Sequence, residues 1–237
     1  MLKIKLFADG ADLNNIKDLS NNPRIVGFTT NPTLMRKAGI KNFKNFALEM
    51  LKIVPDKPIS FEVFADDFLT MEKQAMELAS WGENVNVKIP VTNTQGLFSG
   101  GLISKLSNQG VKLNVTAVMT LEQAFKVIDN LSDDTPAIIS VFAGRIADTG
   151  IDPVPIMAEA VKALSKKPKT ELIWASPREV LNIFQADSIG CHIITATSDI
   201  LKKLDLIGKD LDKFSLETVE MFYRDAKAAG YSINIEK

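Results

Sequence analysis

Short apolar runs alternate with longer, helix-like stretches along the whole chain. The short runs are rich in Val, Ile and Phe and are bounded by Gly, Pro, Asn or Asp, which is typical of β-strands. Eight of them occur in the sequence, at residues 4–9, 25–30, 59–65, 85–91, 112–118, 137–144, 171–176 and 191–197. Between them, apolar residues recur at helical spacing, for example over residues 68–80, 121–130, 156–165 and 177–185.

This alternation predicts the fold class. Strands that alternate with helices pair in parallel through right-handed crossovers. Eight units in 237 residues are about 30 residues each, within the range of a (β/α)8 TIM barrel. An open doubly wound sheet is the rival, but it favours a glycine-rich loop after an early strand, and Asp9-Gly10-Ala11-Asp12 is no GxGxxG. We therefore predict one α/β barrel domain over residues 1–237.

Local signals add detail at the helix ends. Asn31-Pro32, Asp152-Pro153 and Ser176-Pro177 each place a capping residue before a proline, and each predicts the start of a helix. Beyond the eighth unit, residues 215–229 predict an extra amphipathic helix. Its apolar face would cap the barrel or pack on a neighbouring subunit, and it is formed by Leu216, Val219, Phe222 and Tyr223.

Polar residues occupy positions that should face the barrel interior. In the strand over residues 85–91, Val85, Val87 and Ile89 form the helix-facing set, so Asn86 and Lys88 should point inward. A lysine inside a barrel is costly unless it is paired or loses its proton. One interpretation is a buried lysine in a structural ion pair, and the other is a functional amine.

Other strands favour the functional interpretation. Barrel interiors normally carry layers of Val, Ile and Leu, and barrel enzymes keep their sites at the C-terminal rim. Here, polar residues are predicted at inward or strand-end positions near that rim: Asp9, Glu62, Asn114, Thr116, Ser140 and Ser176. The pattern indicates a catalytic constellation around Lys88.

Composition limits the chemistry of such a site. One Cys and one His exclude an intrachain disulfide and the common zinc sites, and no metal-ligand set or nucleotide loop is recognisable. Lys88 is then the plausible nucleophile, attacking a ketone or aldehyde to form an imine. The protonated imine is an electron sink, so a C–C bond can break or form without a cofactor. Asp9 and Glu62 are candidates for the proton transfers.

Two arginines predict an anion site. Ser176-Pro177-Arg178-Glu179 fits a capping box with free N–H groups at a helix start, and Arg145 follows the neighbouring strand. Each arginine could instead pair with a surface carboxylate. Their place after consecutive strands favours a phosphate site, and hence a phosphorylated sugar.

Charge and hydropathy bear on partners and location. The net charge is −1 and no basic run exceeds two residues, so we expect neither nucleic acid nor a membrane as a partner. The first nine residues lack the apolar core of a signal peptide, and no stretch approaches the roughly 20 apolar residues that span a bilayer. A cytoplasmic protein is expected.

At this point the sequence resembles the transaldolase family. The resemblance covers nearly the whole chain and rests on seven motifs in family order at successive strand ends: Phe7-Ala8-Asp9, Thr29-Thr30-Asn31-Pro32-Thr33-Leu34, Phe61-Glu62-Val63, Val87-Lys88-Ile89-Pro90, Leu113-Asn114-Val115-Thr116, Ser140-Val141-Phe142-Ala143-Gly144-Arg145-Ile146 and Ala175-Ser176-Pro177-Arg178.

The resemblance implies a cofactor-free barrel enzyme that moves a dihydroxyacetone unit between sugar phosphates in the pentose phosphate pathway. It gives Lys88 the Schiff-base role, Asp9 the acid/base role in C–C cleavage, and Glu62 with Thr116 and a water the proton transfers of imine formation. It also implies a homo-oligomer, a pentamer or decamer as in the short members. The remaining implied substrate-binding positions are Asn31, Asn114, Ser140, Phe142, Arg145, Ser176 and Arg178.

A sibling activity in the family is fructose 6-phosphate aldolase, which releases free dihydroxyacetone. Those aldolases usually carry glutamine at the position of Glu62 and tyrosine at the position of Phe142. The residues found here are of the transaldolase type, so the resemblance favours transfer over release. An aldolase, or a catalytically silent barrel that binds sugar phosphates, remains the alternative.

Overall fold

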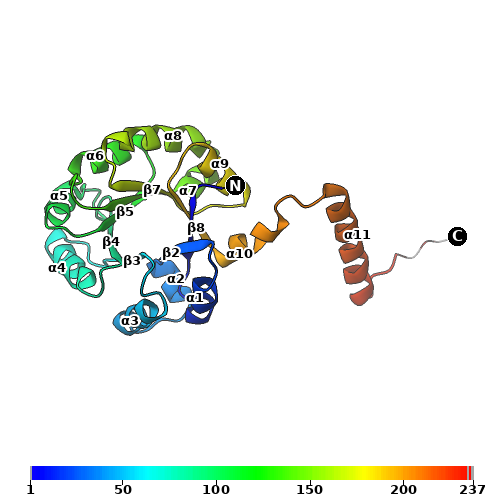
Figure 1. Cartoon of the computed structure of the whole chain (residues 1–237). Helices are drawn as coiled ribbons and strands as arrows, with labels where there is room; N and C mark the ends of the chain where they lie inside the picture. Colours follow the sequence, from blue (N-terminus) through cyan, green and yellow to red (C-terminus); the bar gives the residue numbers. More distant parts are fainter. Residues whose placement is uncertain (1, 234, 236–237) are drawn as a thin grey trace. The chain divides into compact units, whose positions relative to one another are not determined.

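Eight parallel strands pair in chain order and close into a barrel (Figure 1). The computed structural model describes residues 2–233 and 235. The predicted (β/α)8 barrel is thereby confirmed. The strands are β1 (Lys5–Asp9), β2 (Ile25–Thr29), β3 (Ile59–Glu62), β4 (Val85–Pro90), β5 (Leu113–Val118), β6 (Ala137–Val141), β7 (Thr170–Trp174) and β8 (Ile193–Thr197).

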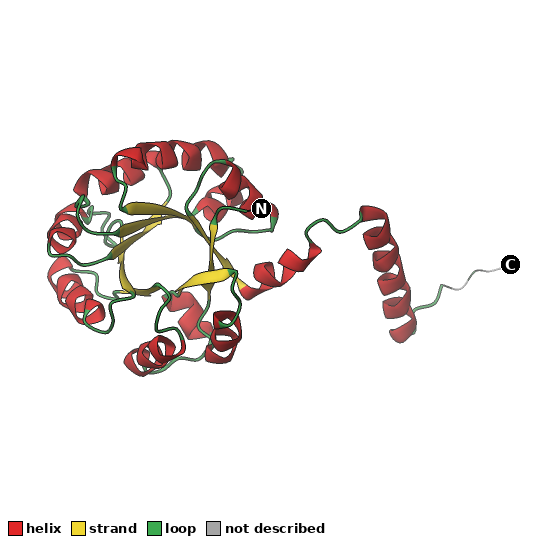
Figure 2. Cartoon of the chain, in the orientation of Figure 1, coloured by secondary structure: helices red, strands yellow, loops and turns green. Residues whose placement is uncertain are grey.

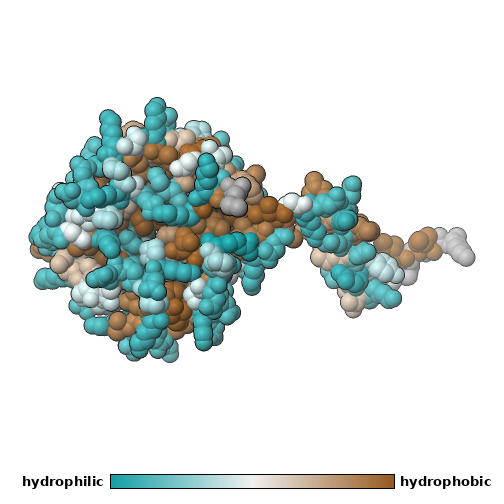
Figure 3. Space-filling view, in the orientation of Figure 1, coloured by the Kyte–Doolittle hydropathy of each residue, from teal (hydrophilic) through white to brown (hydrophobic). Residues whose placement is uncertain are grey.

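Helices surround the strands and connect one to the next (Figure 2). The end of the barrel that Figure 3 shows is largely hydrophilic around its edge. No helix in the described part of the chain is long and apolar enough to cross a bilayer. The barrel helices are α1 (Leu13–Ser20), α2 (Pro32–Lys37), α3 (Phe43–Ile53), α4 (Phe68–Ala79), α5 (Gly100–Asn108), α6 (Leu121–Asn130), α7 (Ala143–Asp148), α8 (Pro153–Ala163), η1 (Leu164–Lys166), α9 (Leu181–Ser188) and α10 (Ser198–Leu201).

Two of the three predicted helix starts are confirmed. Asn31 caps α2 by accepting a hydrogen bond from the Leu34 N–H at 3.0 Å, and Asp152 caps α8 through the Val154 N–H at 2.9 Å. The third prediction is wrong. Ser176 has a φ of 60° in the left-handed region, whereas an N-cap residue is extended, so no helix begins there. Helix α9 begins five residues later, at Leu181.

The barrel interior has an apolar side and a polar side. Strands β1, β6, β7 and β8, with the residue that follows β7, contribute a buried apolar cluster of Phe7, Ile138, Ile173, Ala175 and Ile193. Strands β3, β4 and β5 instead contribute buried polar residues, namely Ser60, Asn86, Lys88 and Asn114. The polar side therefore runs through three neighbouring strands and reaches both mouths of the barrel.

The chain divides into two compact units, residues 1–201 and 202–237. The first contains the barrel. The second contains η2 (Lys202–Leu206) and α11 (Leu211–Ala228), and α11 covers most of the predicted 215–229 helix. Asp210 caps α11 through the Lys213 N–H at 2.9 Å, and Lys209 pairs with Glu217. No residue of α11 is buried, and the predicted apolar face is exposed.

Candidate active site

The C-terminal ends of the strands bring the predicted residues to one rim. Strand pairing places Glu62 beside Lys88, and Lys88 beside Asn114. Thr116 lies two residues further along β5, next to Pro90. Asp9 and Ser140 come from the ends of β1 and β6, so five strands supply polar groups to this rim. This is the end at which barrel enzymes carry their sites.

Lys88 is buried inside the barrel, with 5% of its surface exposed. Its Nζ lies 3.2 Å from Glu62 Oε2 and donates a hydrogen bond to the Thr30 carbonyl oxygen at 3.0 Å. The structural ion pair that the first interpretation expected is thus present. Its partner, however, is one of the two predicted acid/base residues. The pair therefore stabilises the buried ammonium and also places a proton acceptor beside it.

Asp9 ends β1 and is held by hydroxyl groups. The Thr29 hydroxyl donates to Asp9 Oδ1 at 2.8 Å, and Thr29 Oγ1 also lies 2.6 Å from Thr195 Oγ1 on β8. Because Thr29 uses its single proton on Asp9, Thr195 must be the donor to Thr29. Burial raises the pKa of Asp9, while the positive charge of Lys88 and the Thr29 hydrogen bond lower it by less. Asp9 therefore holds its proton more strongly than an exposed aspartate.

A hydrogen-bond chain crosses the polar side of the interior. The Asn114 amide donates to Ser60 Oγ at 3.0 Å, and its oxygen accepts from Ser140 Oγ at 2.7 Å. These contacts fix the amide orientation and leave one Nδ2–H for a ligand. Thr116 is also buried, but its Oγ1 has no partner among the described residues, nor has that of Thr30. Both hydroxyls are therefore buried polar groups that lack a partner in the described part of the chain.

Arg145 and Phe142 lie together after β6. The Arg145 guanidinium lies over the Phe142 ring, 5.2 Å from its centroid, and the ring packs against the apolar interior cluster. Stacking of this kind orients an arginine without neutralising its charge. No hydrogen bond from the Arg145 guanidinium to another described residue accompanies this stacking, so its donors can be offered to an anion.

Arg178 is held differently, by a carboxylate. Its Nε donates to Asp148 Oδ1 at 2.8 Å, and its Nη2 pairs with Asp148 Oδ2. The hydrogen bonds from Arg178 lower the pKa of Asp148, so the carboxylate stays ionised. The pairing with a surface carboxylate that the alternative expected is therefore present for Arg178. Its Nη1 nevertheless donates to Ser176 Oγ at 3.1 Å, which keeps the guanidinium at the predicted anion site.

The backbone part of the predicted anion site is not available. The N–H groups of Arg178 and Glu179 both donate to Asn182 Oδ1, at 2.7 and 3.1 Å. The predicted capping box from Ser176 to Glu179 is absent because the helix begins later, and Asn182 caps these amides from inside α9. An anion at this place would be held by side chains.

A glycine brings the two arginine-bearing segments together. A Cβ on Gly144 would lie 1.5 Å from the Ser176 carbonyl oxygen, so only glycine allows this approach. The Gly144 N–H also donates to the Ala175 oxygen at 3.3 Å. Arg145 and Ser176 are consequently placed at neighbouring strand ends by direct backbone packing.

Asn31 is at the same rim but is partly committed. Its oxygen caps α2, so its remaining amide N–H groups are what it can offer to a ligand. Five residues with clear roles in the geometry were not among the predicted site residues: Thr29, Ser60, Asp148, Asn182 and Thr195. Of these, the three hydroxyl residues carried a usable signal, because Ser60 lies two residues before Glu62 on β3, and Thr29 and Thr195 lie near the C-terminal ends of their strands.

Other catalytic chemistries find little support. The Cys191 thiol is buried, its pKa is raised to about 12, and its Sγ contacts backbone oxygens rather than His192. The His192 Nδ1 accepts a hydrogen bond from the Leu172 N–H at 3.0 Å. Within the described residues, no cluster of His, Cys, Asp and Glu could hold a metal ion.

Comparisons with known proteins give a consistent picture. The profile of the family described as transaldolase/fructose-6-phosphate aldolase matches residues 6–235. A probable transaldolase of Dehalococcoides mccartyi is 35% identical over 202 residues, covering 85% of this chain and 90% of the relative. One of Thermoanaerobacter sp. is 33% identical over 231 residues, covering 97% of this chain and all 100% of the relative.

Solved structures agree on the fold alone. A putative lyase/mutase from Burkholderia cenocepacia superposes with a TM-score of 0.61 at 11% identity, over 87% of this chain and 80% of the other. KGPDC from Streptococcus mutans superposes with a TM-score of 0.53 at 10% identity, over 83% and 88% of the two chains.

Proposed function

Because the chain belongs to the transaldolase/fructose-6-phosphate aldolase family, we propose that it is a transaldolase acting through a Schiff base on Lys88. It moves a dihydroxyacetone unit from sedoheptulose 7-phosphate to glyceraldehyde 3-phosphate, giving erythrose 4-phosphate and fructose 6-phosphate. This reaction belongs to the cytoplasmic pentose phosphate pathway. The observation that carries the proposal is the buried Lys88 amine, which lies between a carboxylate and a row of polar groups at the C-terminal rim.

Imine formation begins with proton removal from Lys88. The Glu62 carboxylate is 3.2 Å from Nζ and can take the proton as a ketose enters. The free amine then attacks the C2 carbonyl carbon, and the resulting carbinolamine loses water to form the imine. Glu62 returns the proton to the leaving hydroxyl through a water beside Thr116, whose buried Oγ1 has no hydrogen-bond partner among the described residues.

Carbon–carbon cleavage uses Asp9. The Asp9 carboxylate takes the proton of the C4 hydroxyl, the C3–C4 bond breaks, and the electron pair moves into the protonated imine. An aldose phosphate leaves and an enamine of dihydroxyacetone stays on Lys88. Addition of the enamine to the aldehyde of an acceptor reverses these steps, and the proton on Asp9 returns to the new hydroxyl. The Thr29–Thr195 hydroxyl pair keeps Asp9 oriented throughout.

The remaining polar residues hold the substrate. The free N–H groups of Asn31 and Asn114, with the Ser140 hydroxyl, are placed to bind hydroxyls of the dihydroxyacetone unit. Arg145, Arg178 and Ser176 bind the phosphate through their side chains. The uncharged dihydroxyacetone end of the ketose phosphate then lies beside Lys88, and its phosphate dianion lies at the outer rim.

Transfer is favoured over release of dihydroxyacetone. Phe142 has no hydroxyl with which to position a proton or a water, and its ring is covered by Arg145. Glu62 is ionisable and pairs directly with the nucleophile. Both residues are of the transaldolase type, so an acceptor aldehyde, rather than water, completes the reaction.

Borohydride trapping tests the Schiff base. Wild-type protein incubated with fructose 6-phosphate and reduced should carry a dihydroxyacetone adduct on the peptide that contains Lys88. Lys167→Met is a matched control, because Lys167 is a structural lysine that pairs with Asp133 and should leave the adduct unchanged. If no adduct forms on the Lys88 peptide, both enzyme hypotheses fail and a silent sugar-phosphate-binding barrel is left.

An acceptor assay then distinguishes transfer from release. A transaldolase turns over fructose 6-phosphate only when an aldose phosphate such as erythrose 4-phosphate is present. Accumulation of free dihydroxyacetone without an acceptor, at a comparable rate, would identify an aldolase instead.

Assembly of several copies completes the proposal. The exposed apolar face of α11 supports a homo-oligomer, a pentamer or decamer, in which this helix packs on a neighbouring copy. Light scattering after gel filtration measures the copy number. Val219→Asp should lower it, and an unchanged oligomer would show that this face is not the interface.

A further inference from the structure

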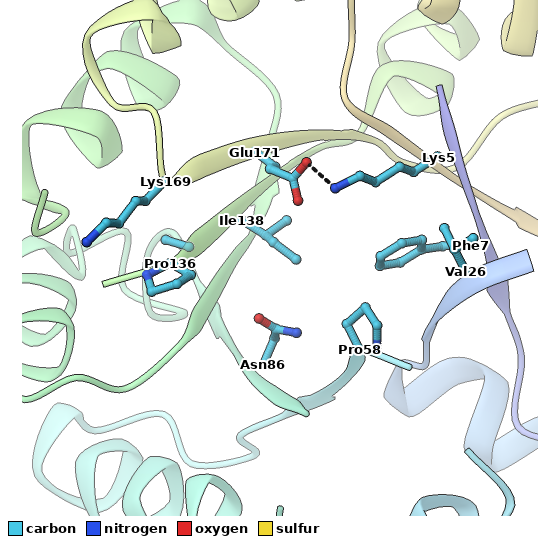
Figure 4. Close-up of a pocket in the computed structure, with 10 residues that line it drawn as sticks. Lys5, Phe7, Val26, Pro58, Asn86, Pro136, Ile138, Lys169 and Glu171 are labelled. Atoms are coloured by element: carbon cyan, nitrogen blue, oxygen red, sulfur yellow. Dashed lines mark hydrogen bonds and ion pairs between the residues drawn. The ribbon is translucent and has the colours of Figure 1, made fainter. Parts of the chain in front are cut away.

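A cavity lies at the N-terminal mouth of the barrel, at the opposite end of the strands from the Lys88 site. It has a volume of about 290 Å³, near the lower end of the range for small-molecule pockets. Its walls come from the first residues of β1, β4 and β7 and from the segments before β3 and β6 (Figure 4). The Phe7 ring and Ile138, both part of the apolar interior cluster, also line it.

Asn86 is the polar residue that the proposed reaction leaves unused. It is 8% exposed, and its side-chain amide makes no hydrogen bond within the part of the chain that the structure describes. Figure 4 shows the amide pointing into the cavity, across from Lys5 and Glu171. The Asn86 amide atoms are not among the polar atoms of the described residues that are closed to solvent and unpaired, so they stay accessible in the cavity. The cavity therefore presents an unused donor and an unused acceptor to whatever occupies it.

A partly exposed ion pair lies on the other side of the cavity. Lys5 Nζ lies 2.8 Å from Glu171 Oε1, which leaves the second carboxylate oxygen and further N–H bonds of the ammonium for a ligand. Lys169 also lines the space, but its Nζ donates to the Asp134 carbonyl oxygen at 2.8 Å and is directed outward. The cavity thus offers one positive group, one negative group and one amide.

We propose that this cavity binds a free α-amino acid with a compact apolar side chain. The ligand carboxylate pairs with Lys5 and accepts from the Asn86 Nδ2–H, while its ammonium pairs with Glu171 and donates to Asn86 Oδ1. The apolar side chain packs on Phe7, Pro58 and Ile138. A zwitterion matches both charges at once, whereas a sugar would leave the apolar floor poorly covered.

Calorimetric titration with L-leucine on the full-length protein tests the proposal. Wild type should bind saturably, and Asn86→Leu and Glu171→Gln should each weaken binding 10-fold or more. Two analogues separate the charges: 4-methylpentanoate lacks the ammonium and 3-methylbutylamine lacks the carboxylate, and both should bind at least 10-fold more weakly. Lys169→Gln is the matched control, and it should bind L-leucine within twofold of wild type.

Three results would overturn the proposal. The wild type would show no saturable binding if the cavity holds only ordered water. Equal affinity in Asn86→Leu and Glu171→Gln, with circular dichroism showing both folded, would place the ligand elsewhere. Competition between L-leucine and fructose 6-phosphate would place it at the opposite rim. None of these depends on transaldolase activity, so the two proposals can fail separately.

Discussion

Two residues of β4 separate the two mouths of the barrel. Asn86 and Lys88 both face the interior, two positions apart, yet their surroundings differ. Lys88 is held by Glu62 and the Thr30 carbonyl within a group of polar residues from five strands. The Asn86 amide has no partner among the described residues, and its cavity contains a single ion pair and mostly apolar walls.

The difference shows what polar groups inside a barrel require. At the C-terminal rim, the buried ammonium and carboxylate satisfy each other, and neighbouring hydroxyls complete the network. Removing one partner there would leave a charge uncompensated. At the N-terminal mouth, the lone amide could be replaced by an apolar side chain with little loss of stability. A dense group of mutually bonded polar residues therefore distinguishes the C-terminal rim from the N-terminal mouth, where one polar amide stands alone.

The largest expected effect is on kcat. It is seen by comparing substitutions of two hydrogen-bonded lysines at opposite ends of the barrel, Lys88 and Lys57. Lys88→Met should lower kcat roughly 10⁴-fold or more, because no other group forms the imine. Lys57 lies before β3, where its Nζ donates to the Ser20 and Ile25 carbonyl oxygens at 2.7 Å each. Lys57→Met should leave kcat within about twofold but lower the free energy of unfolding by about 1–3 kcal/mol.

Steady-state kinetics and urea unfolding on both variants check this contrast. A Lys57→Met enzyme that lost activity while remaining folded would contradict the separation of the two mouths. So would a Lys88→Met enzyme that kept measurable turnover with fructose 6-phosphate and an acceptor.

Asp9 should show a trade-off between activity and stability. Asp9→Asn should lower kcat about 10²- to 10⁴-fold, the usual range for loss of a general acid/base. Burial raises the pKa of Asp9, so the folded chain binds this proton up to a higher pH than the unfolded chain does. The stabilisation from Asp9 is therefore present below the ordinary aspartate pKa of about 4 and is lost as the pH rises through the raised pKa.

Unfolding measured from pH 4 to pH 8 tests the sign. Asp9→Asn cannot ionise, so its stability relative to wild type should increase with pH across this window. A relative stability that falls with rising pH would mean that pairing with Lys88 outweighs the burial of Asp9.

Much of this architecture follows from the sequence. The alternation of apolar runs with helical stretches predicts the barrel, and the inward positions of Lys88, Glu62 and Asn114 follow from the two-residue period of a strand. The same period predicts that Asn86 faces inward. It also explains why Thr195 was accessible to prediction, since it lies two residues after the inward-facing Ile193.

The loops could not be predicted in the same way. The expected helix start at Ser176 depends on local sequence, but the observed backbone there is left-handed and packs against Gly144, which is 32 positions away in the chain. Capping by Asn182 from within α9 is likewise visible only once the turn is built. The Asp148–Arg178 pair joins residues 30 positions apart, and no spacing rule predicts it.

The next effect concerns ion pairs at the rim. Arg178→Ala should raise the KM for phosphorylated donors about 10-fold or more, which corresponds to about 1.4 kcal/mol, with a much smaller change in kcat. The reason is the loss of a planar donor aimed at the phosphate. The KM for unphosphorylated dihydroxyacetone as donor should not change. An equal increase for both donors would show that Arg178 acts through the structure rather than through the phosphate.

The smallest expected effect separates two roles for Asp148. If Asp148 competed with the substrate phosphate for the Arg178 guanidinium, Asp148→Ala would lower the KM for the phosphorylated donor. The geometry instead favours a role for Asp148 in orienting Arg178. Asp148 accepts from the Arg178 Nε–H and from one hydrogen on Nη2, and hydrogens on Nη1 and Nη2 at the end of the guanidinium are left for the phosphate. We therefore expect Asp148→Ala to raise the KM for fructose 6-phosphate about threefold to fivefold.

Glu72→Ala, which breaks the ion pair with Lys105, is the matched control and should leave KM unchanged. Asp148→Asn keeps an acceptor for the Arg178 Nε–H and removes the negative charge. A KM close to wild type in this variant would assign the effect of Asp148 to orientation of Arg178. A KM below wild type would assign it to the charge of Asp148.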